Sequence, residues 1–264
     1  TWKKSEPAPV AAEEDKAVEV LTTLGNERLE ITVSTHGAGI VRAAILGYPS
    51  VKGSDVPVTF DFSDRPAAAP TGYPGLAPRD AFELAASTDD SVTYRKVLPG
   101  GLVLTRTLVL GDGYQVRLAD KLENPTGAPV ALDGYGLQSG FMAHLPGEKD
   151  EQTPLLGVDT LTGSASVEYW NSKFDKWFPV DGDGAPVAVP GPGKEPHHVD
   201  WAAVKNKYFV QILTPENSAD ECLVQTARGE PVRSTFMLLF PRTSHPFARV
   251  AADLRMPDYE LAPG

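Results

Sequence analysis

Glycine and proline recur along the whole chain and limit the structures that it can form. The sequence holds 24 of each, about 18% of its 264 residues, against roughly 12% in an average protein. Both residues weaken helices, so this distribution disfavours a helical bundle. The combined glycine and proline content stays below the roughly 25–30% typical of disordered Pro/Gly chains. A hydrophobic content of 41% is enough for a core. The sequence therefore predicts a β-rich globular protein.

Charge and cysteine content exclude several classes of partner and site. The formal net charge is −11, and such a surface repels phosphate backbones, so we expect no nucleic-acid partner. The single cysteine, Cys222, excludes an internal disulfide and a cysteine-based zinc site. Its neighbours Leu223 and Val224 are apolar, which favours a small buried hydrophobe over a catalytic thiol. A membrane span needs about 20 apolar residues, and no run of that length occurs.

The chain divides into a short N-terminal tether and one domain. Residues 1–17 are charged, rich in proline and alanine, and aperiodic, which indicates a flexible tether. Residues 18–264 show no composition break, and we expect a single domain there. Alternating patterns between turn signals predict strands at 29–33, 56–62, 81–85, 92–98, 102–110, 114–122, 130–137, 158–170, 208–213, 222–227 and 234–240.

Two further segments carry their own patterns. The Gly/Pro/Val-rich stretch 182–198 predicts a long loop. Near the end, four apolar residues follow Pro246 at helical spacing, which predicts one short C-terminal helix near 246–255. These residues are Phe247, Val250, Ala251 and Leu254.

The clearest hairpin joins 102–110 to 114–122 through a Gly-Asp-Gly loop. If Leu110 faces Tyr114, one face of the hairpin is apolar apart from Arg106 and Asp120, which become diagonal neighbours. An unpaired charge in the core would be costly, so we predict an inward ion pair between Arg106 and Asp120. The alternative is that both residues sit at a wet sheet edge.

Most catalytic and metal-binding templates are incomplete. Residues 37–39 (Gly-Ala-Gly) begin a dinucleotide fingerprint, but the third glycine is missing. Within residues 197–200 (His-His-Val-Asp), His198 and Asp200 would share one face of a strand, yet no third ligand is evident and solvated loop histidines are the simpler interpretation. Residues 181–184 (Asp-Gly-Asp-Gly) favour a turn over a calcium loop. We predict no catalytic, cofactor or metal site.

One dense aromatic cluster has two interpretations. It could line a groove for an extended peptide, a partner or a sugar. Alternatively its rings plug the core between two sheets, because a strand places alternate members inside. The cluster comprises Tyr169, Trp170, Phe174, Trp177 and Phe178.

Three segments carry a family resemblance. Residues 29–40 read Leu-Glu-Ile-Thr-Val-Ser-Thr-His-Gly-Ala-Gly-Ile, residues 105–124 contain Thr-Arg-Thr-Leu and Leu-Glu-Asn, and residues 201–215 contain Trp-x-x-Val-x-Asn-Lys-Tyr-Phe and Leu-Thr-Pro. In this order they resemble the large periplasmic domain of the YidC family of bacterial membrane protein insertases. The segment 247–259 is similar to the exit that leads into the family's membrane core.

The resemblance implies a fold and a setting. The fold would be a β-supersandwich, two large antiparallel sheets packed face to face and related to galactose-mutarotase-like carbohydrate domains. The chain would be a non-catalytic domain on the periplasmic side of the bacterial inner membrane, anchored by helices outside it, in an insertase and chaperone. Implied partners are Sec translocon components such as SecDF and nascent membrane proteins. No cofactor is implied.

The competing interpretation is a carbohydrate-binding or aldose-epimerase-like protein of the same fold. That chemistry needs a histidine acid and a carboxylate base that face one sugar. The five histidines of the chain do not lie in sequence contexts similar to the epimerase signatures. Sugar binding in an aromatic groove would favour this alternative, and hydrophobic helices on both sides of the domain would favour the insertase.

Overall fold

Strands make up the regular structure in the described part of this chain. The computed structural model describes residues 17–146, 155–163, 166–171, 186–189, 198–229, 232–234, 242–244 and 247–264. Within these ranges the regular elements are strands, so the all-β prediction is confirmed. In the same ranges no helical segment has the length and hydropathy of a membrane span.

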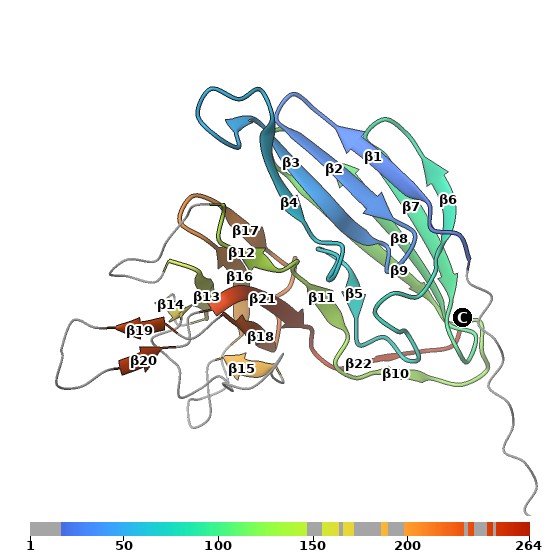
Figure 1. Ribbon diagram of the computed structural model, residues 1–264. Helices are drawn as coiled ribbons and strands as arrows, with labels where there is room; N and C mark the ends of the chain where they lie inside the picture. Colours follow the sequence, from blue (N-terminus) through green and yellow to red (C-terminus); the bar gives the residue numbers. More distant parts are fainter. Residues whose placement is uncertain are drawn as a thin grey trace, which may run out of the picture.

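The first half of the chain forms two four-stranded antiparallel sheets that pack face to face (Figure 1), which we call the first sandwich. One sheet consists of β1 (Leu21–Gly25), β2 (Leu29–Ser34), β3 (Gly39–Pro49) and β4 (Pro57–Asp61), in that order. The other consists of β6 (Glu83–Ser87), β7 (Ser91–Val97), β8 (Val103–Leu110) and β9 (Val116–Glu123).

The core of the first sandwich follows from the alternation in its strands. In β8, residues 104, 106, 108 and 110 are buried, while the threonines between them are only partly covered. Their apolar members meet Leu24, Ile31 and Val33 of the facing sheet, all nearly inaccessible to solvent. Tyr94 of β7 is also fully buried in this core.

The burial of Tyr94 makes stability depend on alkaline pH. Burial raises the pKa of Tyr94 to about 12, above its ordinary value of 10.0. A folded-state pKa above the unfolded value means that this contribution is complete below pH 10 and is lost as pH rises towards 12. We expect urea unfolding to show stability falling over this window more steeply than in Tyr94→Phe. Equal slopes in the two proteins would contradict the assignment.

The second half, together with the short strand β5 from the first half, forms another pair of sheets, which we call the second sandwich. Its larger sheet contains β5 (Pro70–Thr71), β11 (Gly136–Gln138), β12 (Met142–Ala143), β15 (Val187–Val189), β18 (Glu221–Arg228) and β21 (Phe247–Arg255). The sheet that packs on it contains β13 (Gly157–Thr162), β14 (Ser166–Asn171), β16 (Val199–Lys205) and β17 (Val210–Leu213). Two small ladders pair β10 (Val130–Leu132) with β22 (Tyr259–Leu261) and β19 (Val232–Ser234) with β20 (Arg242–Ser244).

A short strand and one arginine tie the two sandwiches together. Strand β11 pairs with β21 on one side and with β5, which follows the first sheet, on the other. Arg65, just after β4, forms an ion pair with Asp253 of β21 and donates to Gln225 Oε1 of β18 at 3.0 Å. Figure 1 shows the resulting arrangement, with the two sandwiches side by side.

The predicted C-terminal helix is wrong, because residues 247–255 form strand β21. This strand pairs with β18 along one edge and with β11 and β12 along the other, and a bulge interrupts its register near Arg228. On one face of β21 Val250, Ala252 and Leu254 are buried, and on the other face Ala251 is buried between the partly covered Arg249 and Asp253. Residues 250–252 therefore form a continuous buried apolar run that lacks the two-residue period of a strand with one covered face. The spacing of Phe247, Val250, Ala251 and Leu254 therefore matches that of a helix although the segment is a strand.

Two smaller expectations also need correction. The predicted loop 182–198 contains the short strand β15, which adds to the edge at β18. In the central hairpin, β9 begins at Val116 rather than Tyr114, and Leu110 pairs with Val116. The shift of two residues preserves the faces and places Arg106 directly opposite Asp120 instead of on a diagonal. The predicted strand 234–240 lies almost entirely outside the described residues.

Candidate functional site

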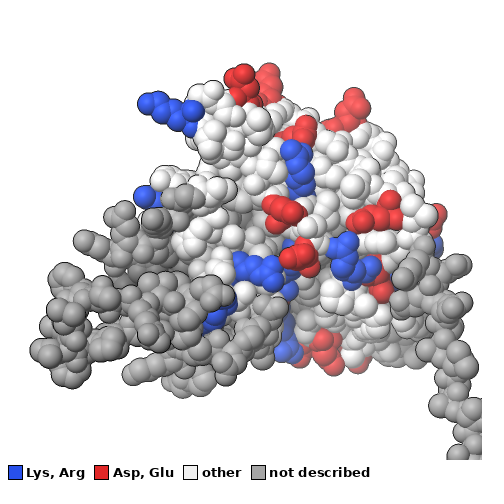
Figure 2. Space-filling view, in the orientation of Figure 1, with Lys and Arg blue, Asp and Glu red and all other residues white. Residues whose placement is uncertain are grey.

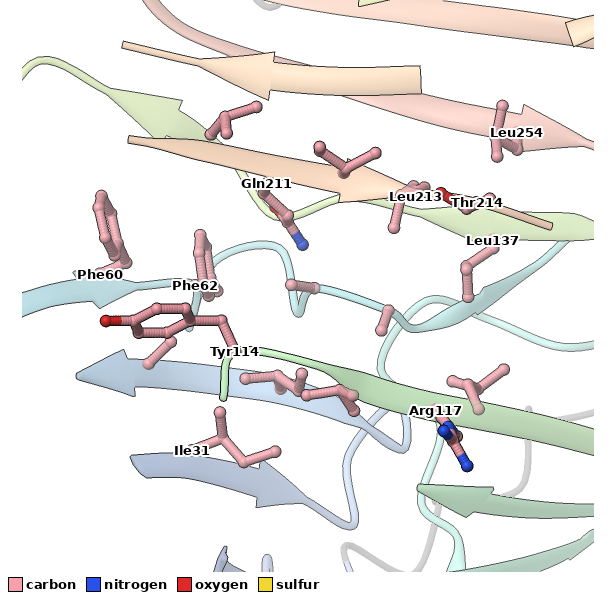
Figure 3. A pocket seen from close by; sticks show the side chains of 18 of the residues that line it. Ile31, Phe60, Phe62, Tyr114, Arg117, Leu137, Gln211, Leu213, Thr214 and Leu254 are labelled. Atoms are coloured by element: carbon pink, nitrogen blue, oxygen red, sulfur yellow. The ribbon is translucent and has the colours of Figure 1, made fainter. Parts of the chain in front are cut away.

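A cleft of about 1130 Å³ opens between the first sandwich and strand β17 of the second. This volume lies slightly above the roughly 300–1,000 Å³ of ordinary ligand sites. It is lined on one side by inner-face residues of β2 and β3 and by residues of β4 and β9, and on the other side by the segment 208–216. Figure 3 shows β17 with Gln211 and Leu213 on one side, and Tyr114 and Ile31 on the other.

The first wall exists because the first sandwich is open along one side. In the described ranges β4 pairs only with β3 and β9 only with β8, so both are edge strands. The apolar inner faces of the two sheets therefore continue into the cleft instead of being sealed from it. Inner-face lining residues include Ile31, Ile40, Ala43, Ile45 and Leu118.

The second wall is a single edge strand. In the described part of the chain β17 pairs with β16 alone. Two of its apolar side chains are more than half exposed, Val210 at 53% and Ile212 at 55%. An exposed apolar edge of this kind is a ready surface for another polypeptide.

Aromatic rings join the two walls at one end of the cleft. The ring of Phe209, at the tip of the β16–β17 hairpin, meets Tyr48 at 5.8 Å and Phe60 at 5.4 Å, both edge-on. Phe60 in turn stacks on Phe62 at 6.1 Å, and Figure 3 shows these two rings side by side. These contacts fix the position of β17 over the first sandwich.

A buried ion pair lies behind the wall formed by β9. The structure contains the pair expected between Arg106 and Asp120: Nε donates to Oδ1 at 2.7 Å and Nη2 to Oδ2 at 2.9 Å. Arg106 is fully buried, while Asp120 is 16% exposed and lines the cleft. Arg106 Nη1 also donates to the carbonyl of Ala68, and Tyr73 Oη donates to Asp120 at 3.1 Å. Burial, together with the Asp120 carboxylate, raises the pKa of Tyr73, which keeps this hydroxyl protonated.

The charges of the cleft balance each other. Besides the paired Asp120, the ionisable lining residues with full charges at neutral pH are Arg117 and Glu216, of opposite sign. Figure 2 shows acidic and basic side chains interspersed on the visible face, without a large area of one sign. Given a net charge of −11 for the whole chain, the cleft is a comparatively neutral and apolar place.

The predicted aromatic groove does not form around Trp170. Trp170 is 4% exposed and packs in the core of the second sandwich, which corresponds to the alternative interpretation of the cluster. Tyr169 points to the other face of β14, where the Lys205 ammonium lies 4.0 Å from the centre of its ring. Phe174, Trp177 and Phe178 lie outside the described residues.

Other residues singled out in the sequence do not contribute to the cleft. Cys222 is completely buried, and burial raises the pKa of its thiol. His198 is largely exposed with Nδ1 3.9 Å from Asp220, while Asp200 accepts a hydrogen bond from Ser218 at 2.7 Å. Residues 181–184 and His197 fall outside the described ranges. In the parts of the chain that the structure describes, no three potential metal ligands gather.

Sequence reasoning missed the cleft because its walls come from distant segments. Residues 208–213 were recognisable as a strand, but nothing local marks it as an edge. The one available signal is that apolar side chains occupy both faces of it, Val210 and Ile212 on one and Leu213 on the other. A strand with two apolar faces is expected to be covered on both faces by other parts of the protein or by a bound ligand.

Comparisons with known proteins agree on family and fold. A family model described as the YidC periplasmic domain matches residues 21–263. A putative aldose 1-epimerase from Escherichia coli K12 is similar in structure, with a TM-score of 0.57 at 10% sequence identity, covering 94% of this chain and 95% of that chain. At this identity the likeness concerns the fold alone, and it supports the predicted galactose-mutarotase-like architecture.

Another solved structure, a galactose mutarotase-like protein from Lactobacillus casei, has a TM-score of 0.47 at 11% identity and covers 93% of this chain and 96% of its own. A galactose mutarotase related enzyme from Lactobacillus acidophilus has a TM-score of 0.46 at 14% identity, covering 93% of each chain.

Proposed function

The chain belongs to the family of YidC periplasmic domains, and from this we propose that it serves a membrane protein insertase by holding an apolar, extended segment of a client protein in its cleft. The family places such a domain in the periplasmic part of a membrane protein. Anchoring on the inner membrane by helices outside this chain is part of the proposal.

The cleft is the observation that carries this proposal. Its lining is mainly apolar, its charges balance, and one wall is an unpaired strand with exposed Val210 and Ile212. A client segment that waits for insertion is apolar and unfolded, so it has both the side chains and the free backbone groups that such a site can bind. Nascent membrane proteins are the occupants we propose, and contact with translocon components such as SecDF would use other surfaces.

Site-specific crosslinking in the full-length insertase tests this function. A photoreactive phenylalanine analogue is placed at Ile212 in the cleft or, as a control, at Val97, which is 55% exposed on β7 away from the lining. In membrane vesicles with a ribosome-bound nascent membrane protein, we expect the adduct to form from position 212. Equal crosslinking from both positions, or none from position 212, would argue against the cleft as a client site.

A carbohydrate-binding or epimerase function is the second candidate, because the fold resembles that of an aldose 1-epimerase. The described histidines, His36, His144 and His198, all lie outside the cleft lining, so the acid that such chemistry requires is not supplied from this part of the chain. We therefore propose a non-catalytic domain. Calorimetric titration with galactose and glucose checks this, and saturable binding of either sugar would favour the second candidate.

A further inference from the structure

We propose that the cleft holds its occupant by strand addition: an uncharged, extended segment of another polypeptide pairs with the free edge of β17 and lays alternate side chains on the apolar wall. This inference rests on the proposed function and specifies how it works. It concerns backbone recognition, which is independent of the exact sequence of the bound segment.

The first support is the unbroken series of lining residues. The segment 208–216 lines the cleft without a gap, and it includes all four residues of β17 (Val210–Leu213). Successive side chains of a strand point to opposite faces, so a strand that presented one face to the cleft would contribute only every second residue. A continuous series arises when the edge of the strand, with its backbone groups, faces the cleft.

The hydrogen-bond pattern of the hairpin identifies which groups are free. The Asn206 N–H donates to the Phe209 carbonyl at 3.0 Å, and the Phe209 N–H donates to Asn206 Oδ1 at 2.9 Å, so these two residues occupy a hydrogen-bonded position of the ladder. Such positions alternate with non-bonded ones along an antiparallel ladder. In the register Lys205 opposite Val210 and Ala203 opposite Ile212, the N–H and C=O groups of Val210 and Ile212 therefore point away from β16.

The surroundings of this edge suit an uncharged chain. Arg117 and Glu216 cancel, and Asp120 is already neutralised by Arg106, so a charged segment would gain no partner in the cleft. Figure 3 shows Gln211 directed into the cleft, where its amide can bond a polar group of the occupant. Opposite β17, β9 and β3 offer apolar side chains to every second residue of an added strand.

Hydrogen exchange of the 264-residue chain tests the pairing directly. The probe is an acetylated and amidated ten-residue peptide of alternating valine and serine. On binding, we expect the amides of Val210 and Ile212 to exchange at least tenfold more slowly. The amides of Gln211 and Leu213 face β16 and serve as internal controls, because they are protected before the peptide is added.

A pair of substitutions at Ile212 separates the backbone from the side chain. Ile212→Ala shortens the side chain and keeps the N–H, whereas Ile212→Pro also removes the N–H, at an edge where proline is tolerated. We expect peptide affinity at least tenfold lower for Ile212→Pro than for Ile212→Ala. Unchanged thermal unfolding in both variants confirms that the ladder with β16 persists.

The outcomes distinguish this inference from the proposed function. If the peptide binds but the two amides stay unprotected and both variants bind equally, strand addition is overturned while the client site stands. If the peptide does not bind the unmodified chain at all, the result contradicts both strand addition and the proposed function. A dimer in sedimentation experiments without peptide, dissociated by Ile212→Pro, would assign this edge to a second copy and also overturn the inference.

Discussion

Asp120→Ala is expected to lower the free energy of unfolding by about 3–5 kcal/mol, because it leaves the fully buried Arg106 guanidinium without its carboxylate. The remaining acceptor described for Arg106 is the Ala68 carbonyl, which is neutral. Urea unfolding followed by tryptophan fluorescence measures the loss.

Three further variants control for this effect. Tyr73→Phe removes one donor to Asp120 and keeps the ion pair, so a loss of only about 1 kcal/mol is expected. Glu123→Gln alters an exposed pair with Lys121 on the same strand and should leave stability unchanged. Combining Arg106→Met with Asp120→Leu should recover most of the loss, since no charge then remains buried. If Asp120→Ala behaves like Glu123→Gln, the pair is not a core interaction.

Gly136→Ala is expected to destabilise the protein by about 3 kcal/mol although it adds a single methyl group. Gly136 lies in β11 between β5 and β21, and a Cβ there would overlap the carbonyl oxygen of Leu254. Because the obstacle is backbone rather than the end of a flexible side chain, β11 and β21 must separate. The strand that connects the two sandwiches is thereby disturbed.

The thiol of Cys222 reports on this change. Cys222 pairs with Leu254 in the same sheet and is inaccessible in the native structure. We expect its labelling by a thiol reagent to be faster in Gly136→Ala than in the unmodified protein. Gly127→Ala is the matched control, because a Cβ at that glycine meets no atom within 4 Å. Identical labelling and stability in the two variants would contradict the role of Gly136.

The alternation of apolar and polar residues predicted the strands of the first sandwich better than those of the second, for a physical reason. Strands β7, β8 and β9 each bury one face, so their apolar residues alternate with polar ones, and Arg106 stood out as a charge at an inward position. Strand β21 also buries Ala251, on the face opposite to Val250 and Ala252, and this continuous apolar run fits a helix as well as a strand. Tertiary surroundings decide such a case.

The ion pair could be predicted and the cleft could not. Arg106 and Asp120 are joined by one hairpin, so a shift of two residues in register still left them on the same face. The cleft instead requires knowing that β4, β9 and β17 are all edges, which depends on partners far away in sequence. Trp170 illustrates the same limit, because an aromatic cluster in sequence does not reveal which rings a second sheet will cover.

The position of β21 within its sheet has a consequence for the order in which the protein can fold. In the first sandwich the strands of each sheet pair with their neighbours in sequence, so both sheets can assemble as the chain emerges. The larger sheet of the second sandwich is built around β21, so β11 and β18 gain their shared neighbour only when residues 247–255 are present. During vectorial synthesis, the ladder that joins β11 and β18 through β21, and the ion pair of Arg65 with Asp253, can therefore form only when almost the whole chain has arrived. The connection between the two sandwiches is therefore completed only at the end of synthesis, after the sheets of the first sandwich can already have formed.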